Sequence, residues 1–158
     1  MTSAEADAII RLYAADILAS EGMAEQQTFV QHGSVTVYDH SLGVARACLA
    51  AGKGLPFSLD VRSLVRGALL HDYFGYDWHE HSERSKGHAL HHARRAAERA
   101  LEHFDISELE YEIVSHHMFP LVPLPPRHAE AWVLCLADKA VALRETLGGL
   151  AERLGWRA

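Results

Sequence analysis

Residues 61–74, VRSLVRGALLHDYF, decide the fold because an apolar helical pattern runs directly into a His–Asp pair. Asp60 stands where a helix N-cap is expected, and the apolar residues after it occupy one helical face: Val61, Leu64, Val65, Ala68 and Leu69. His71 and Asp72 therefore fall at a helix end. Adjacent side chains on a helix diverge by about 100°, so only at such an end can both serve one site.

Helical spacing continues on both sides of this stretch, and little period-two alternation is present. The sequence predicts an all-α fold, a single-domain bundle of about six to seven helices over residues 1–158. Capping-box sequences, glycines and prolines give the boundaries. The expected helices run from the Thr2 and Glu5 box to Gly22, over 24–31, from about 37 to 52–54, from Asp60 to 71–72, over 88–103, from Ser107 and Glu110 through His116 and His117, and from about 128 to Gly148 and Gly149.

Composition narrows the functional classes. Fifteen Lys and Arg against 21 Asp and Glu give a formal charge of −6, which argues against a nucleic-acid partner. No apolar run approaches the roughly 18 residues of a membrane span, and the first residues lack the basic character of a signal peptide. We therefore expect a cytoplasmic protein without a membrane partner. Cys48 and Cys135 are expected to be buried, reduced thiols.

The 12 histidines are the outlying number. Four of them, with two aspartates, fall on five expected helices: His40, the adjacent pair His71 and Asp72, His92, His117 and Asp138. Each is embedded in apolar sequence, where a buried polar group needs a partner. One shared metal centre satisfies them together, as inward side chains do in helix bundles. Imidazole with carboxylate suits Fe, Mn, Zn, Co or Ni.

Asp72 is predicted to serve two ions, because a carboxylate at a helix end has a spare oxygen for bridging. Two divalent transition metal ions at roughly 3.5–4 Å share such a ligand and activate a solvent molecule. Their charge of +4 exceeds the −2 of Asp72 and Asp138, so the expected pocket is locally positive. Such a pocket attracts phosphate.

The order His, His–Asp, His, His, Asp resembles the HD-domain superfamily of metal-dependent phosphohydrolases over roughly residues 36–145, the expected metal-binding core. QHGSVTVYDHS, RGALLHDYFGYDWHEH, the segment from His88, HHMFPL and ADK are similar to an uncharacterised bacterial HD-domain group. The resemblance implies His40, His71, Asp72 and Asp138 for the first ion, and Asp72, His92 and His117 for the second. His116 remains an alternative or additional ligand, although the register with HMFP favours His117.

Further residues are candidates for catalysis or substrate binding. Asp72, His88 and His116 are the catalytic candidates; His88 lies one turn before His92 and is a ligand, a proton donor to the leaving group or a polar residue at the pocket mouth. Gln31 and His32 are placed to reach substrate, and residues 78–81 form a lid or a surface turn. The cationic candidates for phosphate are Lys139 at the pocket rim and Lys86, with Arg84, Arg94, Arg95 and Arg99 on an otherwise solvated stretch.

The expected reaction is hydrolysis of a phosphoester or phosphoanhydride, in a nucleotide or another small phosphorylated metabolite, by a metal-activated hydroxide. Met118, Phe119 and Pro120 follow His117 where the cyclic-dinucleotide branch of the superfamily has Gly-Tyr-Pro, which counts against that substrate. A di-iron HD-domain oxygenase and a non-catalytic, metal-stabilised binding module are the alternatives. No exposed heptad is apparent in the sequence, so the oligomeric state is left open.

Overall fold

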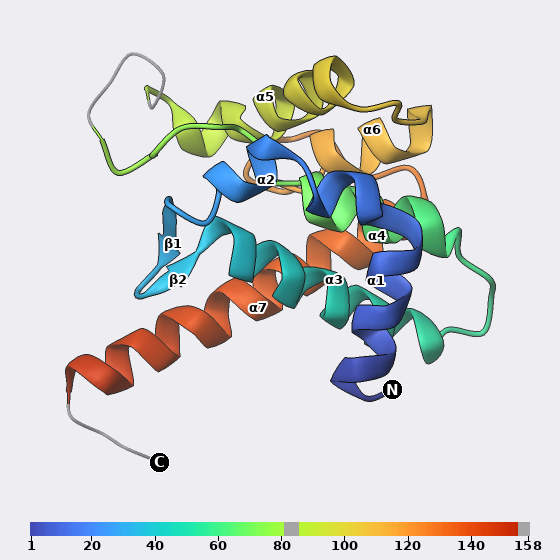
Figure 1. The fold of residues 1–158 in the computed structure, drawn as a ribbon, viewed down its shortest axis with the longest axis horizontal. Helices are drawn as coiled ribbons and strands as arrows, with labels where there is room; N and C mark the ends of the chain where they lie inside the picture. The colour runs from blue at the N-terminus through green and yellow to red at the C-terminus, as the bar shows by residue number, and fades with distance from the viewer. Residues whose placement is uncertain (81–85, 155–158) are drawn as a thin grey trace.

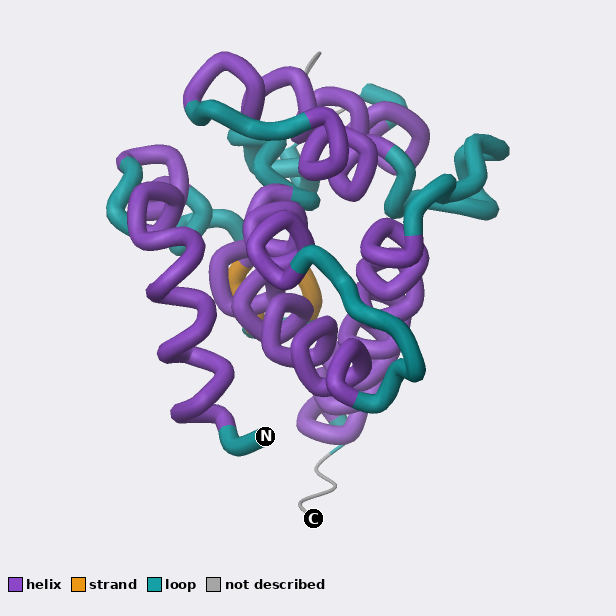
Figure 2. The backbone as a smooth tube through the Cα atoms, turned by 90° about the vertical axis from the view of Figure 1, so that its right-hand side faces the viewer, coloured by secondary structure: helices purple, strands orange, loops and turns teal. Residues whose placement is uncertain are grey.

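The computed structural model describes residues 1–80 and 86–154, apart from the side chain of Glu152, and consists mainly of helices (Figure 1). The elements are α1 (Ser3–Leu18), α2 (Glu21–Glu25), β1 (Val30–His32), β2 (Val35–Thr36), α3 (Val37–Lys53), α4 (Val61–Leu70), α5 (His88–His103), α6 (Glu108–Ser115) and α7 (Ala129–Arg153). The prediction of an all-α bundle with about six to seven helices is confirmed, with seven helices among the described residues. Figure 2 shows that the strands form one short ribbon among the helices.

Several helices start where the sequence predicts. Thr2 and Glu5 form a capping box at α1, and Ser107 and Glu110 form another at α6. At α4 the Asp60 carboxylate accepts a hydrogen bond from the Ser63 backbone N–H at 2.9 Å. Each cap satisfies backbone donors that have no partner within the first helical turn. These local signals therefore fix the helix starts independently of tertiary packing.

The segment after α1 differs from the prediction. Helix α1 ends at Leu18, and the Ser20 hydroxyl caps a new helix by accepting from the Met23 backbone N–H, so Gly22 lies inside α2. Residues 30–36 then form an antiparallel ribbon in place of the end of the expected helix over 24–31. The ribbon turns at Gly33, whose φ of 62° favours glycine.

Helix α7 is longer than predicted because it continues through Gly148 and Gly149 to Arg153. The two glycines read as a stop signal in the sequence. In the structure a Cβ on Gly149 would lie 3.5 Å from the Cα of Gly33. This is an ordinary van der Waals distance, so the turn of the β ribbon lies against the helix at Gly149 without requiring a glycine there.

Helix α4 lies at the centre of the bundle. It contacts α1, α3, α5, α6 and α7, and its residues from Ser63 to Leu70 are all buried. Consequently its C-terminal end carries the next residues, His71 and Asp72, into the interior. Cys48 and Cys135 are free and buried, as predicted. Among the described residues, no helix combines the length and hydropathy that crossing a bilayer requires.

Candidate metal centre

The six predicted ligands converge at one place in the bundle. His40 comes from α3, His71 and Asp72 from the end of α4, His92 from α5, His117 from just beyond α6, and Asp138 from α7. The four imidazoles and Asp72 are buried, and the Asp138 side chain is 13% exposed. Five segments spread over about a hundred residues thus supply one cluster, as the sequence predicts for a bundle core.

All four imidazoles are held in the same tautomer by hydrogen bonds at Nδ1. Three of these nitrogens face backbone carbonyl oxygens: His71 faces Ala68 at 2.8 Å, His92 faces His88 at 2.9 Å, and His117 faces Val114 at 2.7 Å. His40 Nδ1 lies 2.8 Å from Glu145 Oε2. Each Nδ1 must donate to such an acceptor, so each neutral ring has its lone pair on Nε2, directed into the cluster.

The first group of donor atoms lies around His40 and His71. Asp138 Oδ1 is 3.2 Å from His40 Nε2 and 3.6 Å from His71 Nε2. Asp72 Oδ2 is 3.3 Å from His71 Nε2 and 4.0 Å from His40 Nε2. Ligand atoms sharing one metal ion at roughly 2.0–2.2 Å are separated by about 2.9–3.5 Å. Small adjustments therefore suffice to place these four residues around one cation.

The second group consists of His92, His117 and the other oxygen of Asp72. His92 Nε2 lies 3.1 Å from His117 Nε2, and Asp72 Oδ1 lies 3.4 Å from the former and 3.8 Å from the latter. Both Nε2 atoms carry lone pairs in the tautomers described above, so neither donates to the other. A cation between them converts this repulsive contact into coordination.

Asp72 stands between the two groups, with Oδ2 towards one and Oδ1 towards the other. In the described ranges of the chain, buried Asp72 Oδ1 and His71 Nε2 find no hydrogen-bond partner, which is costly for a polar atom. A metal ion at each group would satisfy both atoms. Imidazole and carboxylate are borderline donors that suit Zn, Fe, Mn, Co or Ni. The residues present therefore fit a metal centre, and the carboxylate is positioned to bridge.

Electrostatics keep the carboxylates of the first group ionised. Burial opposes ionisation of Asp72 and Asp138, but the adjacent imidazoles hold the pKa of both carboxyl groups well below the usual value. Burial likewise opposes protonation of His40, yet its hydrogen bonds to Asp138 and Glu145 raise its pKa to about 9. The pKa of His71 is also raised, because the two aspartates outweigh its burial. This half of the cluster has a strong preference for positive charge.

The second group has the opposite character. Complete burial, together with the neighbouring His71 and His92, lowers the pKa of His117 to about 3. Burial and His92 also lower the pKa of His88, which lies next to this group, to about 4. A neutral imidazole is the form that binds a metal ion. His117 is therefore available as a ligand without losing a proton.

The sequence reasoning missed Glu145, which supports His40 from α7. It lies two helical turns after Asp138, so both carboxylates share one face of the helix. His40 is the one cluster histidine whose Nδ1 donates to a carboxylate, an arrangement that increases the basicity of the ligand atom. In the sequence, the seven-residue spacing from Asp138 could have indicated that Glu145 lies on the same helix face.

Glu145 gives a testable prediction for metal affinity. We expect Glu145→Ala to weaken binding of the most tightly held ion about 10- to 100-fold, because His40 loses its orienting acceptor. Glu145→Gln retains an acceptor oxygen and should lose less. A competition titration against a chromophoric chelator measures both constants. Glu98→Ala, on the exposed face of α5, is the matched control, and equal affinities for it and Glu145→Ala would contradict this role.

Two glutamines near the β ribbon hold Asp72 in place. Gln31 Nε2 donates to Asp72 Oδ2 at 2.6 Å, and Gln26 Nε2 donates to the Asp72 backbone oxygen at 3.1 Å. Gln31 also accepts a hydrogen bond from Trp78 Nε1 at 3.3 Å. The ribbon absent from the sequence prediction thus orients the central carboxylate. It also links that carboxylate to the loop after α4.

A cavity of about 630 Å³ opens onto the cluster. Asp72, His92, His117 and Asp138 form part of its lining, and the remainder is Gln31, His32, Trp78, His88, Ala89, Met118, Pro120, Leu121, Lys139 and Ala142. The rings of Trp78 and His88 stack with an interplanar angle of 10°. A small molecule in this cavity would meet the donor cluster on one side and a largely apolar wall on the other.

Not every predicted residue faces this cavity. His116 is the C-cap of α6, contacts the Ser115 hydroxyl and the Glu112 carbonyl, and is not part of the lining. Its side chain therefore lies apart from the cluster that His117 joins, and the catalytic role predicted for it gains no support. Lys86 is exposed beyond the N-terminal end of α5 and is also outside the lining.

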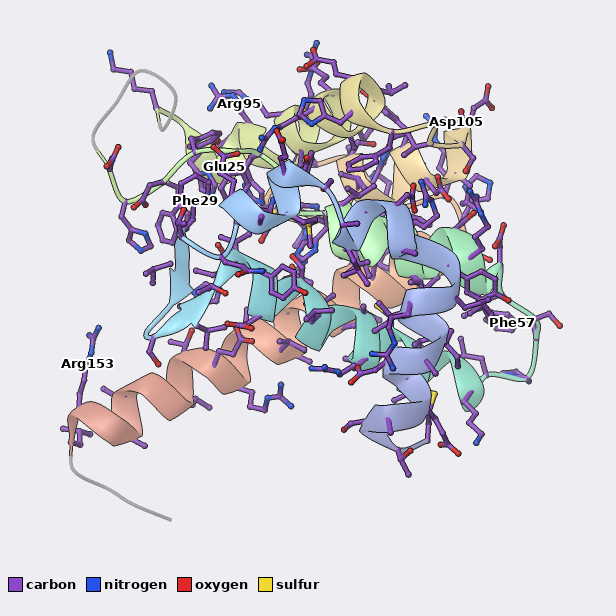
Figure 3. All side chains as sticks on the ribbon, in the orientation of Figure 1. Glu25, Phe29, Phe57, Arg95, Asp105 and Arg153 are labelled. Atoms are coloured by element: carbon purple, nitrogen blue, oxygen red, sulfur yellow. The ribbon has the colours of Figure 1, made fainter. Side chains whose placement is uncertain are left out.

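The other cationic candidates have protein partners. Lys139 lines the cavity, but its ammonium donates to the His117 carbonyl at 2.9 Å and the Cys135 carbonyl at 3.2 Å. Arg94 pairs with Glu98, Arg99 with Glu25, and Arg95 (Figure 3) donates to the Tyr76 hydroxyl. Arg84 and His81 lie outside the described residues. Phosphate binding by these cations stays a prediction.

Comparison with known proteins supports the residue pattern. The model of the HD domain family matches residues 37–143, which is more than half of the chain and includes all six clustered residues. Searches of curated proteins and of solved structures returned no match. Members of the matched family are generally metal-dependent hydrolases. With its central His–Asp pair at the end of a buried helix, the chain belongs to the HD domain family.

Proposed function

We propose that this protein is a phosphohydrolase that uses two divalent metal ions to cleave a small phosphorylated substrate, a nucleotide or another metabolite. The observation that carries the proposal is the position of Asp72. Its Oδ2 lies 3.3 Å from His71 Nε2 and its Oδ1 lies 3.4 Å from His92 Nε2, so one carboxylate faces two imidazole pairs. This is the arrangement expected of a bridging ligand.

His40, His71, Asp72 and Asp138 would hold one ion, and Asp72, His92 and His117 the other. When bound, such ions activate water and neutralise charge on a phosphoryl group. The two aspartates contribute −2 against +4, so the site keeps a positive charge that favours a phosphate dianion. The apolar cavity wall lowers the local dielectric and strengthens that attraction.

His88 is placed to hold a proton on the cavity side of its ring. Arg95 donates to the Tyr76 hydroxyl oxygen at 3.2 Å, and this hydroxyl lies 3.0 Å from His88 Nδ1. We assign the hydroxyl proton to the bond with Nδ1, which leaves the proton of the neutral ring on Nε2. Stacking against His92 and Trp78 fixes the ring plane. We infer that His88 Nε2 donates a hydrogen bond to the substrate.

This role predicts the effect of removing the donor. His88→Ala should lower kcat/KM about 10- to 100-fold, because a hydrogen bond to a charged group is worth about 1.5–3 kcal/mol. His88→Gln carries an amide donor and should recover part of the loss. The exposed neighbour His91, which is not part of the cavity lining, provides the control His91→Ala. If His88→Ala had the same kinetics as the wild type and the His91→Ala control, the assignment of His88 as a donor would be wrong.

The reaction itself is tested by a screen. The purified chain, loaded separately with Mn, Fe, Co, Ni or Zn, is incubated with phosphomonoesters, nucleotides and phosphoanhydrides, and phosphate release is measured. We expect release with at least one metal, in air and under anaerobic conditions. Oxygen consumption by an iron-only form would instead support the oxygenase. A substrate that binds tightly but survives long incubation would support the non-catalytic module.

A further inference from the structure

Helix α7 carries a row of exposed leucines that the metal centre does not use. Leu136, Leu143, Leu147, Leu150 and Leu154, here called the leucine seam, are 63%, 61%, 56%, 52% and 58% exposed. Single exposed leucines are ordinary, but a continuous row along one helix marks an interaction surface. The opposite face of α7, with Ala131, Leu134 and Val141, is buried in the bundle. The helix therefore has two apolar faces.

The seam follows a heptad repeat. With exposed Ala140 and with Val133, which is partly buried against the core, its leucines occupy positions separated alternately by three and four residues: 133, 136, 140, 143, 147, 150 and 154. This is the a and d pattern of a coiled coil, in which each side chain inserts between residues of a facing helix with the same period. The structure thus corrects the sequence interpretation, which found no exposed heptad.

The outer half of α7 also lacks a covering element. Figure 1 shows the helix extending past the β ribbon and away from the remaining helices, and Figure 3 places Arg153 at its projecting end. On the other side of the helix, Gly149 lies against Gly33 of the ribbon turn. Nearer the bundle Leu136 and Ala140 are exposed as well, so a second helix can approach the seam from Leu136 to its projecting end. The heptad positions from residue 133 to 154 span about 32 Å.

We propose that the leucine seam binds the leucine seam of a second copy of this chain, with the two α7 helices antiparallel. A two-fold axis pairs each surface patch with itself, which is the usual closed symmetry of a homodimer. Two helices meeting along about 32 Å bury on the order of 1,000 Å² in total, which is about the minimum for a biological interface. Antiparallel pairing also lays each projecting end against the body of the other copy.

One charge beside the seam favours this orientation. Antiparallel packing with Leu136 opposite the partner's Leu147 brings Arg153 to the partner's Trp132. Trp132 is 38% exposed in this chain, so its ring can accept a cation–π contact from that guanidinium.

Sedimentation equilibrium of the full chain tests the interface. We expect a dimer for the wild type, and at least a hundredfold increase in the dimer Kd for Leu143→Glu/Leu147→Glu, because the double substitution places four charges in one interface. Leu101→Glu, on α5 at 54% exposure, should leave the Kd unchanged.

Circular dichroism and metal content identify a misfolded variant. If it misfolds, the milder Leu143→Ser/Leu147→Ser replaces it. A monomeric wild type at 100 times the protein concentration of the activity assay, or a folded variant that remains dimeric, overturns the proposal.

Cysteine cross-linking tests the orientation. A mixture of Leu136→Cys and Leu147→Cys chains should form a disulfide between copies, whereas Leu143→Cys alone should not. Cys48 and Cys135 are buried and present in every variant, so the wild-type chain gives the background level of disulfide formation between copies. A Leu143→Cys homodimer linked through this position would show parallel helices and overturn the antiparallel arrangement.

Discussion

Asp72→Asn should abolish metal-dependent phosphate release, with a loss on the order of a thousandfold or more in kcat/KM. The substitution preserves the size of the side chain and its acceptor oxygen but removes the charge that two cations would share. It also leaves a buried amide whose N–H₂ group points into the cluster of imidazole and carboxylate atoms. We therefore expect at least one bound ion to be lost per chain, measured by elemental analysis of untagged protein.

Asp77→Asn is the matched control for this variant. Asp77 is five residues further along, partly exposed, and accepts hydrogen bonds from the His79 backbone N–H and side chain. Within the described part of the chain its side-chain hydrogen bonds go to His79 and not to the six clustered residues, so the activity and metal content of this variant should equal those of the wild type. Wild-type phosphate release by Asp72→Asn with its full metal content would contradict the bridging role. If Asp72→Asn lost metal but the wild type released no phosphate, Asp72 would still belong to a metal site. The proposed phosphohydrolase activity would then be rejected.

The sequence predicts which six residues cluster, because its signals are local. Asp60 caps α4 as expected, and the apolar face that follows it is buried, so His71 and Asp72 reach the interior. His92 and His117 are likewise surrounded by small or apolar residues in sequence. Polar residues in such surroundings are costly without a shared partner, and this cost is readable without a structure.

The supporting residues are less predictable because they depend on tertiary contacts. Gln31 reaches Asp72 from a strand 41 residues earlier, and no local pattern indicates that distance. In the sequence, Glu145 looks like any charged residue on an exposed helix face. Its contact with His40 becomes visible only when α3 packs against α7. The register with HMFP favours His117 over His116, but the separation of the two side chains is visible only in the turn at the end of α6.

The leucine seam illustrates a further limit of periodicity. Leucines and alanines on α7 satisfy a helical pattern whichever face is buried, so the sequence indicates one amphipathic helix. Packing uses Leu134 and Val141 for the core and leaves Leu136 and Leu143 exposed. The second apolar face becomes visible only after the first has been assigned.

Arg66→Met should lower the free energy of unfolding by about 3–5 kcal/mol, the usual effect of breaking a buried ion pair. The Arg66 side chain is 3% exposed within α4, and its Nε lies 3.1 Å from Oε1 of Glu110, which is fully buried. Its Nη1 also donates to both carboxylate oxygens of Asp16, at 2.7 and 2.9 Å. Removing the guanidinium leaves the Glu110 carboxylate without its buried counter-charge.

Arg62→Met is the control, because it removes an exposed arginine from the same helix. It tests whether the loss of stability comes from the burial of Arg66 or from removing any arginine of α4. Arg62 Nη1 lies 2.9 Å from the same Glu110 oxygen, but its side chain is 51% exposed. Solvent screens this pair, so the expected loss is below about 1 kcal/mol. Urea unfolding at fixed metal concentration measures both variants, because bound metal itself stabilises the folded state. The double variant Arg66→Met/Glu110→Gln should be more stable than Arg66→Met, since it removes the stranded charge. Equal, small losses for Arg62→Met and Arg66→Met would show that the buried position of Arg66 confers no special stability.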